Sequence, residues 1–206
     1  MYESRLERIG SAAAGIAHDL NNQLSLIVNN LTLPGEEGVN DARKAAERCS
    51  ALTGSLLSYC RTGRIDVQSL DPAKLVRRFV SQLRLPEGVR LELDVPVSLP
   101  LIRANSMSVM RALVNLAGNA CDAMNNQGRL RISAAAQQIE VSDSGPGIPH
   151  AVIRRMFEPF YSTKGGEGYG LGLAIVRETM REQGGYVAVN SEPGRGAHFI
   201  LRFRAA

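Results

Sequence analysis

The sequence predicts an α+β protein in which an antiparallel helical hairpin precedes an α/β two-layer sandwich. In the first sixty positions, apolar residues recur at steps of three and four, which is the helical period. From residue 71 onward, strand-like segments are interleaved with helical ones, as expected of helices packed on a sheet. Two glycine-rich stretches, 143–149 and 168–176, lie in this second part.

Composition excludes several classes of protein. The chain has 206 residues, 44% of them hydrophobic, and no run approaches the ~18 apolar residues of a membrane helix. The first residues, MYESRLERIG, are charged and polar, so we expect no signal peptide. A net charge of +4 without a Lys/Arg block argues against nucleic acid as a partner. The three cysteines lack metal-ligand spacing, which fits a reducing cytoplasm best.

Residues 1–63 are predicted to form the helical hairpin. The seam of its first helix is Ile9, Ala13, Ile16, Leu20, Leu24, Ile27 and Leu31. Pro34 and Gly35 break this helix, and Asn40 is the predicted cap of the second. The second seam is Ala42, Ala46, Cys49, Leu52 (or Thr53), Leu56 and Tyr59. Because one hairpin cannot bury both seams, we expect a homodimer through residues 1–63, forming a four-helix bundle.

His18 is predicted to point away from the seam of the first helix. It lies two residues from both Ile16 and Leu20, and each residue turns a helix by about 100°. A neutral imidazole is a competent nucleophile, and the adjacent Asp19 can orient the ring or take its proton. Asn22 lies one turn further on the same face. A solvated surface histidine is the alternative for this segment alone.

Residues 64–70 are predicted to be a short polar linker, and residues 71–206 a second domain. Asp71 followed by Pro72 predicts a helix start, and that helix should run to about Leu85. Strands are predicted at 89–94, 99–104, 129–136, 137–143, 185–192 and 196–204, and further helices at 105–124, 151–160 and 171–183.

The helix predicted over residues 105–124 carries two stripes. The apolar stripe is Met110, Val114, Ala117, Cys121 and Met124. The polar stripe is Asn115, Asn119 and Asp122, of which the carboxylate is expected to be a surface group. Carboxamides, a strand-end carboxylate and a glycine-rich helix start can together hold a magnesium nucleotide.

Each candidate residue suits one part of such a nucleotide. Asp143, at a predicted strand end, can accept a hydrogen bond from the adenine amino group, and Gly145 and Gly147 let the backbone approach the base. Carboxamide oxygens are hard ligands for Mg²⁺, which keeps water and phosphate oxygens in its other positions. We expect Asn119 to coordinate the metal directly, with Asn115 beside it on phosphate or on metal-bound water.

The second glycine stretch is the candidate phosphate site. Gly168, Gly170, Leu171 and Gly172 lie where the last predicted helix begins, and free N–H groups at a helix start can hold phosphate oxygens. Lys164 can add a positive charge. Alternating glycines alone are a weak signal, because neither a Rossmann fingerprint nor a P-loop sequence is present.

These segments resemble the sequence boxes of two-component sensor histidine kinases, in the order of that family. Residues 15–31, GIAHDLNNQLSLIVNNL, resemble the histidine box, closest to the subgroup written G-I-A-H-D-F-N-N, and residues 46–61 are similar to its second bundle helix. The remaining resemblances are 115–124 to the N box, 143–149 to the first glycine box, 157–164 to the F box with Phe157 and Phe160, and 168–176 to the second glycine box.

The resemblance implies a Bergerat-type ATP-binding sandwich, shared with gyrase, mismatch-repair and heat-shock ATPases, with ATP and Mg²⁺ as cofactors. It implies that His18 is the phosphoacceptor, Asp19 its acid/base partner and Asn22 the residue used in phosphatase activity. The phosphoryl group is then expected to pass to an aspartate on the receiver domain of a response regulator.

Two other functions stay open at this point. One is a non-catalytic or phosphatase-dominant phosphotransfer scaffold with a relic nucleotide domain. The retained Asn119, Asp143 and glycine boxes argue against it. The other is an ATPase of the same superfamily (GHKL) coupled to conformational change, which leaves the outward pair of His18 and Asp19 unexplained.

Overall fold

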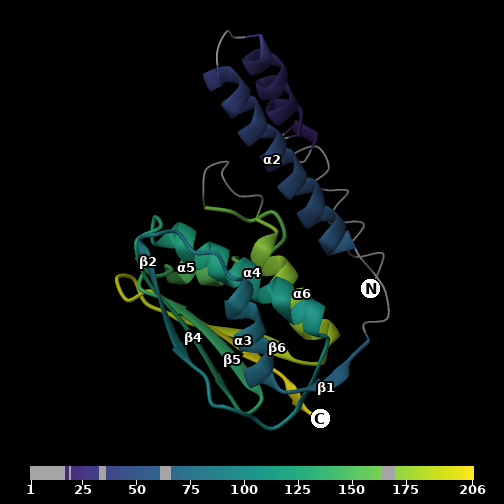
Figure 1. The fold of residues 1–206 in the computed structure, drawn as a ribbon, viewed down its shortest axis with the longest axis vertical. Coiled ribbons are helices and arrows are strands. Elements are labelled where there is room, and N and C mark those ends of the chain that lie inside the picture. Colours follow the sequence, from purple (N-terminus) through teal and green to yellow (C-terminus); the bar gives the residue numbers. More distant parts are fainter. Residues whose placement is uncertain (1–16, 19, 33–35, 61–65, 164–169) are drawn as a thin grey trace.

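A computed structural model of the chain describes residues 17–18, 20–32, 36–60, 66–163 and 170–206. Two helices form a hairpin at one end of the molecule, and the remaining elements form a sheet with helices against it (Figure 1). This is the α+β arrangement that the sequence predicts. Among the described helices, none is both long and apolar enough to cross a membrane.

The hairpin consists of a helix over residues 20–31 and of α2 (Glu36–Cys60). Ala42 and Leu52 are buried as predicted. Ala45 is buried in place of Ala46, so the second seam is displaced by one residue at this position. The seam residues Ile9, Ala13 and Ile16 lie outside the described part of the chain.

The start of α2 differs from the prediction. The helix begins at Glu36, so Asn40 lies inside it and does not cap it. Glu36 and Glu37 occupy the first turn, where carboxylates interact favourably with the positive end of the helix dipole. This electrostatic preference favours the earlier start.

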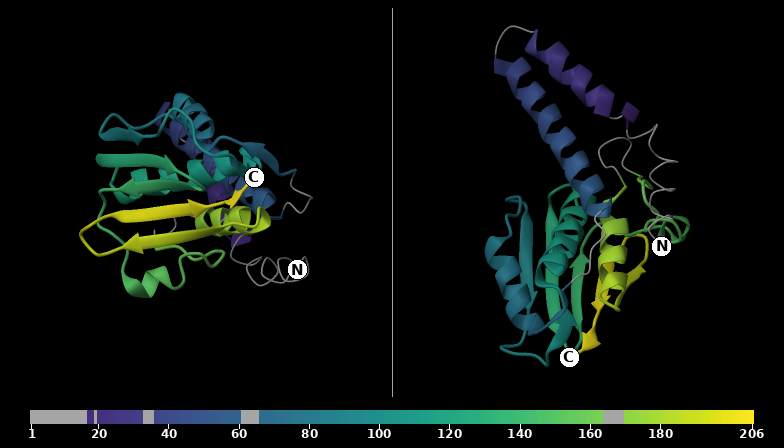
Figure 2. Two further views of the ribbon diagram at one scale, coloured as in Figure 1. Left: turned by 90° about the horizontal axis from the view of Figure 1, so that it is seen from below. Right: turned by 90° about the vertical axis from the view of Figure 1, so that its right-hand side faces the viewer.

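A five-stranded sheet forms the base of the second domain, in the order β2-β4-β5-β7-β6. β2 runs parallel to β4, and the other neighbours are antiparallel. In the register of the central strands, Val141 lies opposite both Ile132 and Phe199. The strands are β2 (Val89–Asp94), β4 (Gly128–Ala135), β5 (Gln138–Asp143), β6 (Tyr186–Ser191) and β7 (Ala197–Arg202), and Figure 2 shows them side by side.

A second, small sheet joins the two ends of this domain. Its order is β1-β3-β8, with antiparallel neighbours. The strands are β1 (Gln68–Leu70), β3 (Ile102–Ala104) and β8 (Arg204–Ala205). Residues 68–70 were expected in the linker, but they pair with β3, and Leu70 packs against the core. The predicted linker is therefore too long at its C-terminal end.

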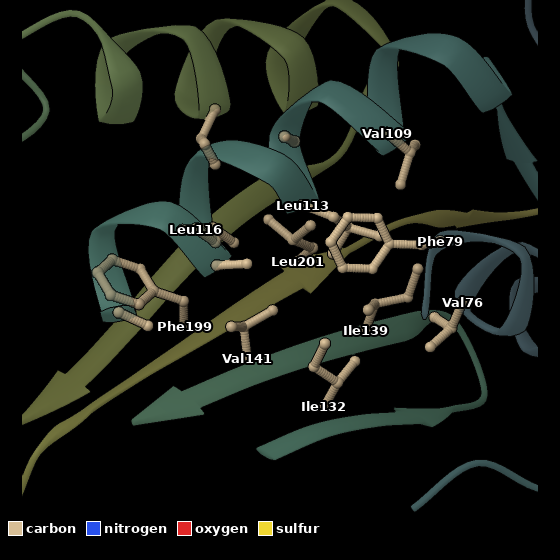
Figure 3. Close-up of a cluster of buried hydrophobic side chains, with 14 of the residues drawn as sticks. Val76, Phe79, Val109, Leu113, Leu116, Ile132, Ile139, Val141, Phe199 and Leu201 are labelled. Atoms are coloured by element: carbon tan, nitrogen blue, oxygen red, sulfur yellow. The ribbon is translucent and has the colours of Figure 1, made fainter. Parts of the chain in front are cut away.

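Three helices cover one face of the large sheet: α3 (Pro72–Gln82), α4 (Ser106–Ala123) and α6 (Gly172–Glu182). A short α5 (His150–Ile153) follows the turn after β5. Burial of apolar area between these layers is the main stabilising contribution. The buried side chains in Figure 3 include Val76, Phe79, Val109, Leu113, Leu116, Ile132, Ile139, Val141, Phe199 and Leu201.

The buried face of α4 is wider than the predicted apolar stripe. Ala117, Cys121 and Met124 are buried as predicted, whereas Val114 is 58% exposed. The other buried positions are Val109, Ala112, Leu113, Leu116 and Ala120. Since α4 packs against α3, α6 and the sheet at once, it buries a broad arc rather than a single line.

Asp71 is expected to be a strong contributor to stability. Its Oδ1 accepts hydrogen bonds from the N–H of Ala73 at 2.8 Å and of Leu99 at 3.3 Å, in a buried position. Asp71→Ala should lower the free energy of unfolding by about 2 kcal/mol, because both N–H groups lose their acceptor. Urea denaturation measures this. The control is Asp94→Ala, whose exposed pair with Arg131 should be worth less than about 0.5 kcal/mol. Equal losses of unfolding free energy in the two variants would contradict the stabilising role given to Asp71.

Candidate functional site

A cavity of about 880 Å³ lies between the C-terminal half of α4, the turn after β5 and the start of α6. It brings together segments that are far apart in the sequence. The predicted site residues that line it are Asn115, Asn119, Asp143, Gly147, Gly170, Leu171 and Gly172. Lys164 and Gly168 lie outside the described residues.

Asp143 occupies the end of β5, as predicted. Its Oδ1 accepts hydrogen bonds from the N–H of Gly145 at 2.8 Å and of Ala197 at 3.3 Å. Burial raises the pKa of the Asp143 carboxyl above its ordinary value, and these two hydrogen bonds partly oppose the rise. Both of these hydrogen bonds end on Oδ1, and Oδ2 accepts none from the described residues. Oδ2 is therefore available to a donor on a ligand.

Glycines allow the turn around Asp143. Gly147 has a φ of +75°, and a Cβ there would lie 2.0 Å from the carbonyl oxygen of Glu192. A Cβ on Gly196, which was not among the predicted site residues, would lie 1.9 Å from the carbonyl oxygen of Asp143. Gly196 thus lets β7 approach closely enough for Ala197 to hold the carboxylate.

Gly147→Ala is expected to destabilise the fold and to weaken ligand binding at the cavity. Alanine there combines a positive φ with overlap against Glu192, which should cost about 2 kcal/mol or more in the free energy of unfolding. The matched control is Gly118→Ala, inside α4, where a Cβ meets nothing within 4 Å. That change should stabilise by about 0.5–1 kcal/mol. Thermal unfolding of both variants tests the pair, and a stable Gly147→Ala protein would contradict the argument.

The two asparagines of α4 differ in their hydrogen bonding. Asn115 donates from Nδ2 to the carbonyl oxygen of Arg111 at 2.9 Å. Its Oδ1 faces the start of α6, 3.0 Å from where a Cβ on Gly172 would lie. The side chain of Asn119 lies beside it, half-buried, and makes no hydrogen bond with the described residues. Its carboxamide is therefore available to a ligand.

The donor set at Asn119 suits a metal that also binds the ligand. One carboxamide oxygen with phosphate oxygens and water is a typical environment for Mg²⁺. Within the described residues, no group of three or more His, Cys, Asp or Glu side chains could hold a metal. Asp122 is exposed, as expected, and lines the same cavity.

The start of α6 forms the other wall. Gly170 has a φ of +62°, and its carbonyl oxygen accepts a hydrogen bond from the N–H of Phe160 at 3.0 Å. The buried Leu171 is the N-cap residue and makes no side-chain capping hydrogen bond. The first N–H groups of this 11-residue helix therefore suit phosphate oxygens.

The F-box phenylalanines do not line the cavity. Phe157 packs against the main core, and Phe160 against Leu171 and its neighbours. Tyr161 lines the cavity instead, with the guanidinium of Arg155 4.5 Å from its ring centroid. The sequence reasoning also missed the apolar lining residues Ile148, Val152, Met156, Leu173, Ala197 and Phe199. Apolar positions flanking the two glycine stretches were the available signal for most of them.

His18 lies on the hairpin and is exposed, as predicted. Asn22 is on the same face, with its Nδ2 3.3 Å from Nδ1 of His18. Asp19 lies outside the described residues. The residues that line the cavity do not include His18.

The fold and the cavity define a class of ATPase. The family described as "Histidine kinase-, DNA gyrase B-, and HSP90-like ATPase" matches residues 104–206. Sensor kinase CckA of Brucella abortus (strain 2308) is 30% identical over 229 residues, covering 96% of this chain and 24% of the relative. Sensor histidine kinase ZraS of Escherichia coli (strain K12) is 31% identical over 215 residues, covering 97% of this chain and 46% of the relative.

Solved structures extend the likeness to the hairpin. Full-length ShkA in complex with AMPPNP has a TM-score of 0.69 at 27% identity, covering 97% of this chain and 46% of that one. Histidine kinase ThkA, in complex with response regulator protein TrrA, has a TM-score of 0.81 at 21% identity, covering 100% and 64%. The chain belongs to this ATPase family, as the catalytic core of a two-component sensor histidine kinase. It spans about half or less of the length of the curated relatives it matches.

Proposed function

We propose that the chain is a protein-histidine kinase that transfers the γ-phosphoryl group of ATP to His18. The observation that carries the proposal is the cavity itself. It places the available Oδ2 of Asp143, the available carboxamide of Asn119 and the N-terminus of α6 around one space. These three groups suit the base, the metal and the phosphates of Mg-ATP respectively.

The base and the phosphates are held by different parts of the cavity. Oδ2 of Asp143 accepts a hydrogen bond from the adenine amino group, whereas guanine presents a carbonyl oxygen at that position. N–H groups at the start of α6 bind phosphate oxygens. Asn119, with Asn115 beside it, would hold Mg²⁺, which supplies positive charge to the transferring phosphates.

The transfer step forms one bond and breaks another. A ring nitrogen of His18 attacks the γ-phosphorus in line, and the bond to the bridging oxygen of ADP breaks with its electron pair on ADP. Asn22 lies beside the ring, with its Nδ2 3.3 Å from Nδ1. Asp19, the next residue in the sequence, would stabilise the positive charge of the imidazole as the new bond forms.

The exposed surface of the hairpin supports dimerisation through residues 1–63. Its helices expose large apolar side chains, which a second copy would cover in a four-helix bundle. The most exposed are Leu24, Leu26, Val28, Leu31, Val39 and Leu57.

The receiving partner is the receiver domain of a response regulator, with an aspartate as the final acceptor. The relatives CckA and ZraS are sensor kinases, and likeness to them covers the hairpin as well as the sheet domain. Asn22, beside His18, would also support dephosphorylation of the response regulator. We place this reaction in the cytoplasm, where ATP is supplied.

Phosphotransfer tests the proposal. The chain is incubated with Mg²⁺ and γ-labelled ATP, freed of nucleotide, and mixed with a panel of receiver domains. Label should leave the chain and appear on at least one receiver domain, and a His18→Ala chain should donate none. ATP hydrolysis at full rate by His18→Ala, with no label on the wild-type chain, would support a plain ATPase. ATP binding without any label would support a scaffold.

A further inference from the structure

Two adjacent asparagines follow the C-terminal end of α4 in an uncommon backbone conformation. Asn125 and Asn126 have φ values of 49° and 59°. Side chains other than glycine rarely adopt positive φ, although asparagine tolerates it best. The N–H of Asn126 donates to the carbonyl oxygen of Cys121 at 2.8 Å, and that of Asn125 to Asp122 at 3.0 Å. The turn is therefore held in place by the helix it ends.

The turn also packs against the strands beside Asp143. A Cβ on Gly88 would lie 2.5 Å from the carbonyl oxygen of Asn126. A Cβ on Gly128 would lie 2.7 Å from Oγ of Ser144, the residue after Asp143. Because of these close approaches, the two asparagines lie at the same end of the cavity as Asp143, the residue proposed to bind adenine. Asn126 lies seven residues beyond Asn119, past the end of α4.

Both side chains line the cavity and are exposed. Neither makes a hydrogen bond with the described residues, so each offers unused N–H donors and a carbonyl acceptor. Ala123 and Ile148, which also line this region, bring apolar side chains to it. This turn therefore offers side-chain donors to a polar group on the base.

We propose that Asn125 and Asn126 hydrogen-bond acceptor nitrogens of the adenine ring. This inference rests on the ATP binding of the proposed function. The carboxylate of Asp143 can pair only with the amino group, which leaves the acceptor nitrogens N1, N3 and N7 of the ring without a donor. A carboxamide can donate to such a nitrogen and accept from the neighbouring amino group, as asparagine does with adenine in DNA. The two residues then help select the base, in addition to shaping the turn.

Glycine variants separate binding from turn formation. Asn125→Gly/Asn126→Gly removes both carboxamides but retains access to positive φ. The matched control is Gln137→Gly, which changes another residue of positive φ, 61°, in the β4–β5 turn outside the cavity lining. A second pair, Asn125→Asp and Asn126→Asp, keeps the side-chain shape and removes the N–H donors.

Calorimetric titration with ATP and with ADP, and thermal unfolding, are measured for every variant. The glycine double variant should raise the Kd of both nucleotides about tenfold without a lower Tm, and the aspartate variants should change in the same direction. Gln137→Gly should bind as the wild type does. An unchanged Kd in the double variant, or a loss of affinity for ATP but not for ADP, would overturn this inference and leave the proposed function intact. A wild-type chain that binds no ATP would overturn the proposed function with it.

Discussion

Asp143→Asn is expected to weaken ATP binding about a hundredfold and, at neutral pH, to raise the free energy of unfolding. In the variant, an amide oxygen at the position of Oδ1 still accepts from Gly145 and Ala197. The amide nitrogen then takes the place of Oδ2 and meets the adenine amino group, donor against donor. Binding is lost for this reason, while the fold keeps its two local hydrogen bonds.

The gain in stability should depend on pH. Because burial raises the pKa of Asp143, the native protein binds a proton at this carboxyl more tightly than the unfolded chain does. The contribution of Asp143 to stability is therefore largest below its ordinary pKa and falls as pH rises through the raised native pKa. The neutral side chain of the Asp143→Asn variant has no such loss of stability. The variant should therefore be more stable than the wild type only at pH values above the ordinary pKa of the carboxyl.

Urea denaturation across pH, with ATP titration at neutral pH, measures both effects. Asp94→Asn is the control, because its carboxylate is exposed and outside the cavity lining. It should leave the ATP affinity unchanged. A variant at Asp143 that binds ATP normally, or that is less stable than the wild type at neutral pH, would contradict the assigned role.

Asn119→Ala should slow phosphorylation of His18 about a thousandfold in Mg²⁺. The side chain of Asn119 makes no hydrogen bond with the described residues, so its loss should not disturb the fold. The reason for the slow rate is loss of the carboxamide that would hold the metal against the phosphates. Because the base contacts remain, ATP affinity measured in EDTA should be nearly unchanged.

Rates of label incorporation and ATP titrations with Mg²⁺ or EDTA test this prediction. Asn190→Ala, an exposed asparagine on β6, is the control and should behave as the wild type. If Asn119→Ala retained the wild-type rate, or lost ATP affinity equally in EDTA, Asn119 would not be the metal ligand.

Local sequence signals were sufficient for much of the fold. Asp71 before Pro72 marks the start of α3, and the side chain of Asp71 caps it. Asn105 likewise caps α4, accepting from the N–H of Ser108 at 2.9 Å. The hairpin of β4 and β5 also follows from local alternation, and it delivers Asp143 to the cavity. Each of these features depends on residues close in sequence.

Features that depend on distant pairing could not be predicted in this way. β1 and β8 have only three and two residues, and both pair with β3 from opposite ends of the domain. Ala197 reaches Asp143 only because β7 pairs with β5. The spacing of Val114 predicts a core position, but its exposure depends on which neighbours surround α4.

The most direct test of the account is to locate the phosphoryl group after incubation with Mg²⁺ and γ-labelled ATP. Label on the wild-type chain should be acid-labile and alkali-stable, as a phosphohistidine is, and should map to the peptide that contains His18. It should be absent from His18→Ala and strongly reduced in Asn119→Ala. Label that survives acid, or that persists in His18→Ala, would contradict the account, as would ATP binding with no label at all.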